Sequence, residues 1–379
     1  MKRRNPDVDN IAICYRIYPT ENQIVFFKKT IGCCRKVWNL LLLDVLKYYE
    51  ENHEYSINTP AFYKEKYTYL KSADSLALCN VQLKLHEAFC NYFSDPDIYG
   101  VPRFKAKYRE RMSYTTNKIG KNIVIGDNFI KLPKVGRVNA VIHREPDSMW
   151  RLKSATISMK QDGTWYVSVL FEMDYVSLPC VPVERETTLG IAMSPGVFYV
   201  DSNGEFCEFP DYYQKTMKQF EHAKRSLMRK ELGSNSYDKQ KQRVDKLAVK
   251  LQNQRKDFLH KRSTEIANAY SCVSAEMLNL RVLAPKGFSG KKEALDIGFG
   301  DFKSMLSYKM RYRGKTFVTS DYWFPASQIC SSCGNRFKVC FEDKNYVCPF
   351  CGMILDKNVN CAINIKEDGL RLLNSISDL

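Results

Sequence analysis

Two Cys-x-x-Cys pairs near the end of the chain, Cys330 with Cys333 and Cys348 with Cys351, constrain the fold more than any other feature. Each pair presents two thiolates from one tight turn. Two such pairs complete the tetrahedral four-sulfur set that is typical of a structural zinc ion. The spacing therefore predicts a zinc ribbon over residues 326–354, with zinc as a structural cofactor.

The charge of the chain indicates its class of partner. The 379 residues carry a formal net charge of +16, from 58 basic and 42 acidic side chains spread along the whole length. Such an excess is typical of proteins that bind a polyanion, because each neutralised phosphate releases a counterion. A merely soluble basic protein is the alternative. The length predicts more than one domain, and a hydrophobic content of 44% is enough for packed cores.

The N-terminus and the remaining cysteines indicate the compartment. The chain begins with Met1-Lys-Arg-Arg and no apolar signal core follows. No run of about 18 apolar residues exists, so we expect no membrane partner. The cysteines outside the two pairs have no disulfide spacing and fit small core residues in a reducing bacterial cytoplasm.

The first half of the chain switches from strand to helix and back. Ile11, Ile13, Tyr15 and Ile17 alternate as in a strand, and Thr20-x-x-Gln23 then predicts a capping box at the start of a helix. Helical spacing continues to about residue 93, after which strand patterns and a Gln161-Asp-Gly163 hairpin signal follow. We predict a β-barrel (wedge-like) domain over 1–19 and 100–183, interrupted by a helical recognition domain over 20–99.

The second half reads as strand, hairpin, helix, strand, helix, strand and helix from Thr188 onward, the order of an RNase-H-like α/β fold. We expect this domain over 184–325, with the final motif and a C-terminal helix over 355–379. It includes a helical hairpin over 211–270, in which lysine and arginine outnumber the acids. A basic nucleic-acid face and an ordinary solvated helix face are both open readings.

Several motifs occur in the order found in one protein family. They include Pro102-Arg-Phe-Lys105, Ala275-Glu-Met-Leu-Asn-Leu280 and Trp323-Phe-Pro-Ala-Ser-Gln-Ile-Cys-Ser-Ser-Cys-Gly334. The chain resembles, nearly end to end, the transposon-encoded TnpB family, compact relatives of type V CRISPR effectors. The resemblance implies a RuvC-type nuclease domain with an inserted zinc ribbon. It also implies a guide RNA and a double-stranded DNA target beside a short motif; we expect a monomer.

The residues at the nuclease positions depart from the family pattern. Two-metal nucleases hold Mg²⁺ with several carboxylates. Here Ala192 stands where the family has its first Asp, Glu276 keeps the second acid, and Asn358 stands at the last ligand position. Asp356 lies about 200° around the helix from Asn358 and cannot replace it. Three carboxylates become one, so we expect a vestigial site, no productive Mg²⁺ binding and no enzymatic activity.

These departures change the predicted function. An engineered inactivation would explain Ala192, but Asn358 is a second change of a different kind. The chain is therefore most similar to the TldR proteins, naturally nuclease-dead relatives that act as RNA-guided transcriptional repressors. We expect it to block RNA polymerase by occupancy. Two alternatives stay open: an RNA-guided transposon endonuclease, engineered dead or with a rearranged metal site, and a guide-free zinc-ribbon DNA-binding accessory protein.

Candidate nucleic-acid contacts lie in the first half of the chain. Basic residues mixed with tyrosines suit phosphate contact plus base stacking, and amide side chains can pair with adenine. A solvated loop and a buried helix with incidental amides are the alternatives. The candidates are Asn80, Gln82, Arg103, Lys105, Lys107, Arg109, Tyr114, Lys134 and Arg137.

Overall fold

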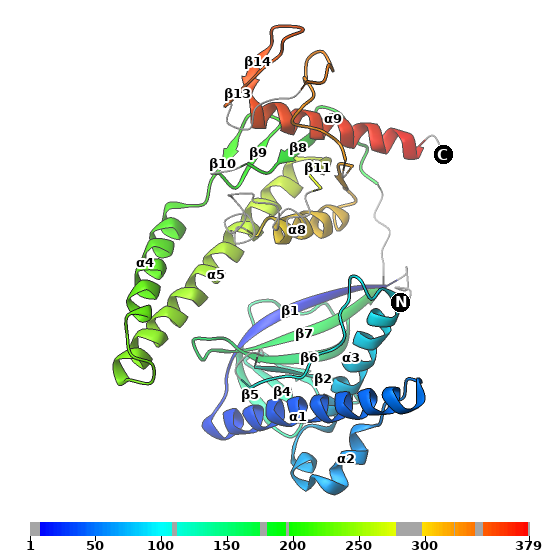
Figure 1. Cartoon of the computed structure of the whole chain (residues 1–379), viewed down its shortest axis with the longest axis vertical. Helices are drawn as coiled ribbons and strands as arrows, with labels where there is room; N and C mark the ends of the chain where they lie inside the picture. The colour runs from blue at the N-terminus through cyan, green and yellow to red at the C-terminus, as the bar shows by residue number, and fades with distance from the viewer. Residues whose placement is uncertain are drawn as a thin grey trace. The chain divides into compact units, whose positions relative to one another are not determined.

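The computed structural model describes residues 8–107, 112–174, 180–194, 197–277, 298–321, 323–337 and 344–377 (Figure 1). The chain forms two compact units, Met1–Val176 and Ser177–Leu379. Within the described ranges, no helix combines the length and the hydropathy needed to cross a membrane.

The first unit is built on a seven-stranded antiparallel sheet with the order β2-β6-β7-β1-β5-β4-β3. Its strands are β1 (Val8–Tyr18), β2 (Ser113–Asn117), β3 (Val124–Ile125), β4 (Phe129–Leu132), β5 (Gly136–Val141), β6 (Arg151–Met159) and β7 (Trp165–Asp174). The alternation predicted for β1 is confirmed, because Ile13, Tyr15 and Ile17 are buried. The predicted barrel corresponds to this sheet, and among the described residues no ladder joins its edge strands β2 and β3.

Helices inserted between β1 and β2 cover this sheet. They are α1 (Glu21–Asn52), α2 (Pro60–Lys66), the 3-10 helix Thr68–Ser72 and α3 (Ser75–Ser94). The predicted capping box is present, since the Thr20 amide donates to Gln23 Oε1 at 3.0 Å. Phe27 of α1 lies 5.2 Å from the Trp165 ring of β7, centroid to centroid. The helical and strand regions predicted as two domains therefore share one hydrophobic core.

The second unit contains a five-stranded sheet with the order β10-β9-β8-β11-β12. Its strands are β8 (Thr188–Ala192), β9 (Tyr199–Asp201), β10 (Phe206–Cys207), β11 (Cys272–Ala275) and β12 (Thr316–Thr319). The central strands β8, β11 and β12 are parallel, and β9 and β10 run antiparallel to form a hairpin edge. The predicted succession of strands and helices is the one observed in this unit.

Helix α9 (Lys357–Ser377) packs directly on β8 and β11, and α8 (Phe299–Arg311) packs beside β12 (Figure 1). The approach of α9 requires Gly190 in β8, because a Cβ there would lie 2.1 Å from the Ala362 carbonyl oxygen. The sequence between Gly190 and Ala192 is thus held against the start of α9, where the last family motif lies.

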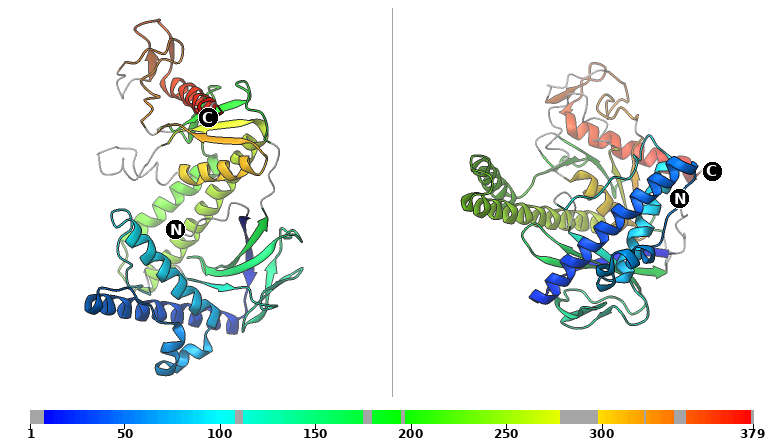
Figure 2. Two further views of the ribbon diagram at one scale, coloured as in Figure 1. Left: turned by 90° about the vertical axis from the view of Figure 1, so that its right-hand side faces the viewer. Right: turned by 60° about the horizontal axis from the view of Figure 1, so that its bottom comes forward.

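Two further parts extend from this sheet (Figure 2). The predicted hairpin is confirmed as α4 (Asp211–Met228) and α5 (Asn235–Ala269), joined by a turn in which Ser234 caps α5 by accepting from the Tyr237 amide at 3.1 Å. The ribbon contributes the short antiparallel strands β13 (Asn345–Val347) and β14 (Ile354–Asp356), and α9 follows β14 directly.

Candidate metal centres and nucleic-acid pocket

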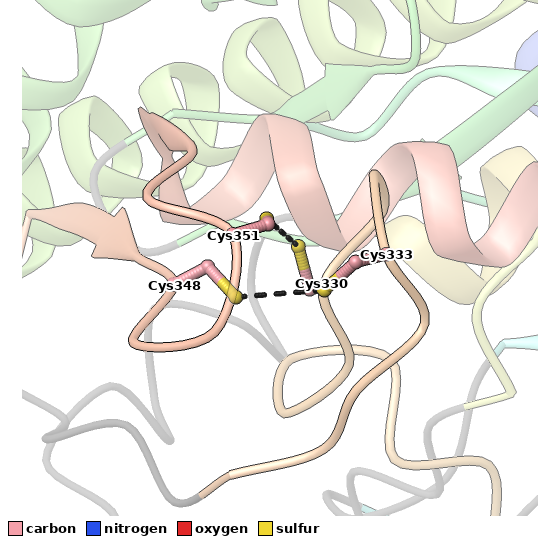
Figure 3. A group of neighbouring side chains, drawn as sticks. All are labelled: Cys330, Cys333, Cys348 and Cys351. Atoms are coloured by element: carbon pink, nitrogen blue, oxygen red, sulfur yellow. Dashed lines mark hydrogen bonds between the residues drawn. The ribbon is translucent and has the colours of Figure 1, made fainter.

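The four predicted cysteines converge in the ribbon (Figure 3). The sulfurs of Cys330, Cys333, Cys348 and Cys351 all lie within 4.8 Å of one another. The Cys330–Cys351 and Cys333–Cys348 sulfur pairs are each 3.6 Å apart. A tetrahedral zinc with Zn–S bonds of about 2.3 Å requires sulfur–sulfur edges of about 3.8 Å. The donor set and its spacing therefore fit a structural zinc ion.

The surroundings of Cys333 favour the thiolate form that zinc requires, whereas burial and the neighbouring sulfurs raise the pKa of Cys351 to about 11. The Asn335 main-chain N–H lowers the pKa of Cys333 to about 6, and the Asn335 side-chain Nδ2 lies 3.5 Å from the same sulfur. Hydrogen bonds to a sulfur stabilise its negative charge. Beneath the site, the buried Tyr346 ring packs 4.9 Å from Phe337, so the ribbon has a small core of its own.

Two asparagines of α9 attach the ribbon to the second unit. Fully buried Asn360 donates from Nδ2 to the Ile329 carbonyl at 2.8 Å and accepts the Ser331 amide at 2.9 Å. Asn364, one turn later, donates to the Ala326 and Ile329 carbonyls at 2.8 and 2.6 Å. Both asparagines thus form hydrogen bonds with the main chain that leads into the turn of Cys330 and Cys333. The motif after the second cysteine pair therefore fixes the first pair.

Two of the residues at the nuclease positions, Ala192 and Glu276, lie at one end of the β8–β11 ladder. Ala192 ends β8, is 1% exposed and packs with Cys361 and Ala362 of α9. Glu276 follows β11, and its Oε2 accepts the Met193 amide at 3.2 Å. Burial raises the pKa of Glu276 to about 7, opposed by the Met193 N–H and by the Lys303 ammonium. The Glu276 carboxylate thus lies next to the strand end at which Ala192 packs against Cys361 and Ala362 of α9.

Two polar residues at the start of α9, Asp356 and Asn358, have different roles. Asp356 precedes the helix and accepts the Asn358 and Val359 amides at 2.8 and 3.3 Å, the contacts of an N-cap side chain. Asn358 is half-buried and shares a helical face with Cys361 and Ala362, three and four positions on. That face meets Ala192. Asp356 therefore caps the helix, whereas Asn358 is on the face of α9 that meets Ala192.

A pocket of about 300 Å³ in the first unit brings together four of the candidate nucleic-acid residues: Asn80, Lys105, Lys107 and Tyr114. Asn39 holds the main chain of Lys105 from both sides, accepting its amide at 2.8 Å and donating to its carbonyl at 3.0 Å. The Lys105 ammonium lies 3.8 Å from the centre of the Trp38 ring. The pocket is therefore a shaped, positively charged hollow between α1, α3 and β2.

Two of these candidates are engaged within the protein. Tyr114 is 5% exposed, and its ring packs 6.2 Å from Phe27 in the core. The prediction that Tyr114 offers a stacking face is therefore wrong, because the inward position on β2 buries the ring. Asn80 donates to the Leu76 and Thr115 carbonyls, both at 3.1 Å, so the donors of its amide are used in joining α3 to β2.

The other candidates do not line this pocket. The Lys134 ammonium donates to the Lys71 and Ala73 carbonyls at 2.9 and 2.7 Å and thereby holds the end of the 3-10 helix. Exposed Arg137 lies over the Phe129 ring at 4.5 Å. Arg103 is exposed and Gln82 half-buried, and both stay predictions. Arg109 lies outside the described residues.

The pocket also contains cations that the sequence reasoning missed. Arg35 of α1 and Lys84 of α3 line it, and Lys84 donates to Thr115 Oγ1 at 3.2 Å. Arg35 belongs to the segment Gly32-Cys-Cys-Arg-Lys-Val-Trp-Asn39, which also supplies Trp38 and Asn39. Neither periodicity nor charge singles out these members of the segment in the sequence.

The parallel sheet with a hairpin edge, the C-terminal helix and the inserted four-cysteine ribbon define the RuvC-like class of α/β fold. Three family models match parts of the chain: "Cas12f1-like, TNB domain" over residues 299–365, "Helix-turn-helix domain" (OrfB_IS605) over 10–54 and "Probable transposase" (OrfB_IS605) over 175–285. The chain belongs to the TnpB-like OrfB/IS605 family. The stretch matched by the helix-turn-helix model forms β1 and the single long helix α1.

Relatives cover almost the whole chain. A protein from Streptomyces pristinaespiralis, named as an RNA-guided DNA endonuclease, is 28% identical over 95% of this chain and 89% of its own length. InsQ of Escherichia coli K12, named likewise, is 25% identical over 96% of this chain and 93% of its own. In a solved Cas12f1–sgRNA–target DNA complex, one chain superposes with a TM-score of 0.59 at 13% identity, covering 92% of this chain and 83% of that one. This last likeness shows a shared fold.

Proposed function

We propose that this protein binds double-stranded DNA under the direction of a guide RNA, does not cut it, and represses transcription by blocking RNA polymerase. The family membership and the names of its relatives support guide-directed DNA binding. In this proposal base pairing selects the target, and the protein supplies motif recognition and a positively charged frame.

The observation that carries the proposal is the environment of Ala192. Its side chain offers no oxygen and is enclosed by the apolar Cys361, Ala362 and Ile365. Of the three nuclease positions, only Glu276 carries a carboxylate, and its raised pKa further reduces its charge near neutrality. Two divalent cations held a few ångströms apart require several anionic oxygens. The residues present therefore do not fit a two-metal site.

The first test is biochemical. The protein is purified with its associated RNA, the RNA is sequenced, and a duplex matching its guide portion is incubated with the complex and Mg²⁺ or Mn²⁺. We expect a discrete RNA, stable binding of the matched duplex and no strand cleavage by denaturing electrophoresis. Guide-dependent cleavage by the unmodified protein would overturn the inactive assignment. Absence of any discrete RNA would favour the guide-free DNA-binding alternative.

The second test concerns repression. A reporter promoter that carries the matched site is transcribed in the presence of the protein and its guide. We expect transcription to fall, and to recover when mismatches are placed in the guide next to the recognised motif, since pairing begins there. The control is the same protein with an unrelated guide. Equal repression by matched and unrelated guides would contradict guide-directed occupancy.

A further inference from the structure

Helix α5 carries an uninterrupted row of cations on one face. The members of this cationic row are Lys239, Arg243, Lys246 and Lys250. Their spacing of four, three and four residues places them within about 60° of one another around the helix and over a length of about 16 Å. All four side chains are exposed, and within the part of the chain that the structure describes none of them forms an ion pair.

The row is turned away from the contact between α4 and α5. Gln240 donates to the Ala223 carbonyl at 2.9 Å, and Arg255 donates to the Tyr213 hydroxyl at 3.0 Å, so these positions define the side of α5 that faces α4. The centre of the cationic row lies about 90° from Gln240 and about 150° from Arg255 around the helix. Its charges therefore project to solvent rather than supporting the hairpin.

Charge complementarity defines the kind of partner. Asp238 and Asp245, the nearest acids along α5, project more than about 100° from the centre of the row. Four cations without an intervening acid match a partner with a dense line of anions. Residues 239–250 contain no aromatic side chain, so the row lacks the stacking platforms typical of single-strand binding. A double helix presents phosphates at about one charge per 1.7 Å and needs no stacking.

We propose that the cationic row of α5 binds the phosphate backbone of double-stranded DNA without regard to sequence and without a guide RNA. This activity goes beyond the proposed guided repression and does not depend on it. Sequence-independent electrostatic contact lets a protein slide and hop along DNA. The row would thus hold the protein on DNA during the search for a target, before any base pairing.

Helix α4 offers a matched control on the same hairpin. Lys215, Lys218 and Arg225 of α4, and Arg229 directly after the helix, are also exposed and recur on one helical face. However, Asp211 lies on that face and Glu221 borders it. The net charge of this face is therefore lower, although the same number of cations can be neutralised there. Changing four residues to glutamine in either helix alters the net charge of the protein by the same amount.

The test measures binding of guide-free full-length protein, freed of RNA by nuclease and ion exchange, to a random-sequence DNA duplex at several salt concentrations. For K239Q/R243Q/K246Q/K250Q we expect the log–log salt slope to become shallower by about 3 to 4, at about 0.9 per lost phosphate contact. Affinity at about 0.1 M salt should fall at least tenfold. The matched α4 variant should retain most of the affinity, and the charge-preserving K239R/K246R/K250R variant should bind like the unmodified protein.

Several outcomes would overturn the proposal. Equal losses in the α4 and α5 variants would indicate general charge rather than a docking surface, and an unchanged salt slope in the α5 variant would exclude the row. An α5-specific loss confined to an RNA–DNA hybrid or a single RNA strand would assign the row to guide binding instead. Guided repression is measured separately with the RNA-loaded protein, so a failure there does not affect the result with guide-free DNA.

Discussion

Helix α9 contacts both the zinc ribbon and the region of the nuclease positions, and these two regions carry different fractions of their expected ligands. The ribbon retains four cysteine sulfurs within 4.8 Å of one another. At the nuclease positions only Glu276 remains of the acids expected for the family. Under the proposed function, the two regions contrast ligands that support folding with ligands that support chemistry alone.

Physical chemistry accounts for the difference. A structural zinc contributes directly to folding, and its four thiolates have no other partner that can neutralise them together. Loss of one cysteine would release the ribbon and expose the groups that Asn360 and Asn364 hold. Carboxylates of a two-metal site repel one another when no metal is bound, so their replacement leaves the fold intact or relieves strain. In the proposed inactive protein, selection would therefore preserve the ribbon and not the acids.

The largest expected effect comes from breaking the ribbon. Cys348→Ser removes one of four zinc ligands, and we expect the zinc content to fall from one ion per chain and the ribbon to lose a stabilisation on the order of 10 kcal/mol. Elemental analysis and thermal unfolding measure the two effects. Cys79→Ser, at an exposed cysteine outside the ribbon, should change neither. Full zinc occupancy in Cys348→Ser would contradict the four-sulfur site.

The second prediction concerns the nuclease positions, where a substitution introduces a carboxylate. Ala192→Asp places a carboxylate at a position that is 1% exposed and lined by apolar side chains, so we expect a loss of about 3 kcal/mol in the free energy of unfolding. With Asn358→Asp added, Mg²⁺ should bind and restore part of this loss. Thermal unfolding with and without MgCl₂ measures both effects.

Ala192→Asn is the neutral control for this comparison. It has nearly the same shape as the aspartate and should be insensitive to Mg²⁺, because an amide offers no charge to a hard cation. If Ala192→Asp were as stable as the unmodified protein in the absence of metal, the site would be more open to solvent than the packing around Ala192 indicates.

A smaller effect is expected where the two regions are joined. Asn360→Ala leaves the Ser331 amide and the Ile329 carbonyl without their partner, which should cost about 2 to 3 kcal/mol. Zinc should stay bound, so proteolysis of the ribbon should accelerate while elemental analysis is unchanged. Ser375→Ala, at an exposed hydroxyl of the same helix, serves as the control. Simultaneous loss of zinc would mean that the anchor and the metal site fold as one.

Sequence patterns predicted the parts of this molecule that depend on local chemistry. Cysteine spacing identified the ribbon ligands, and alternation at Ile13, Tyr15 and Ile17 identified β1. These features succeed because a metal turn and a strand face are set by residues close together in the chain.

Features that depend on tertiary position were missed. The contacts of Lys134 with the end of a 3-10 helix were not predicted, and Tyr114, predicted as a stacking ring, lies in the core. Composition cannot distinguish an exposed cation from one whose donors are used at main-chain carbonyls. The anchoring role of Asn360 likewise requires a contact across about thirty residues of chain. Long-range partners, not local pattern, decide these roles.

The smallest predicted effect concerns Glu276, the acid among the three nuclease positions. The folded-state pKa of Glu276, about 7, exceeds its usual value of 4.5, so the folded protein binds a proton more tightly than the unfolded chain. The contribution of Glu276 to the free energy of unfolding is therefore greatest at low pH and is lost as pH rises through about 7. The Lys303 ammonium limits the rise in the pKa of Glu276, and among the described residues the Cys361 thiol is a second titratable neighbour. Between pH 6 and 8 we expect Glu276 to account for a loss of about 1 kcal/mol in the free energy of unfolding.

Glu276→Gln keeps an acceptor for the Met193 amide and should remove this dependence of stability on pH, as measured by chemical denaturation of both proteins across this range. Parallel slopes would show that the carboxylate is hydrated and ionised, and hence that the site around Ala192 is still open enough to admit a cation.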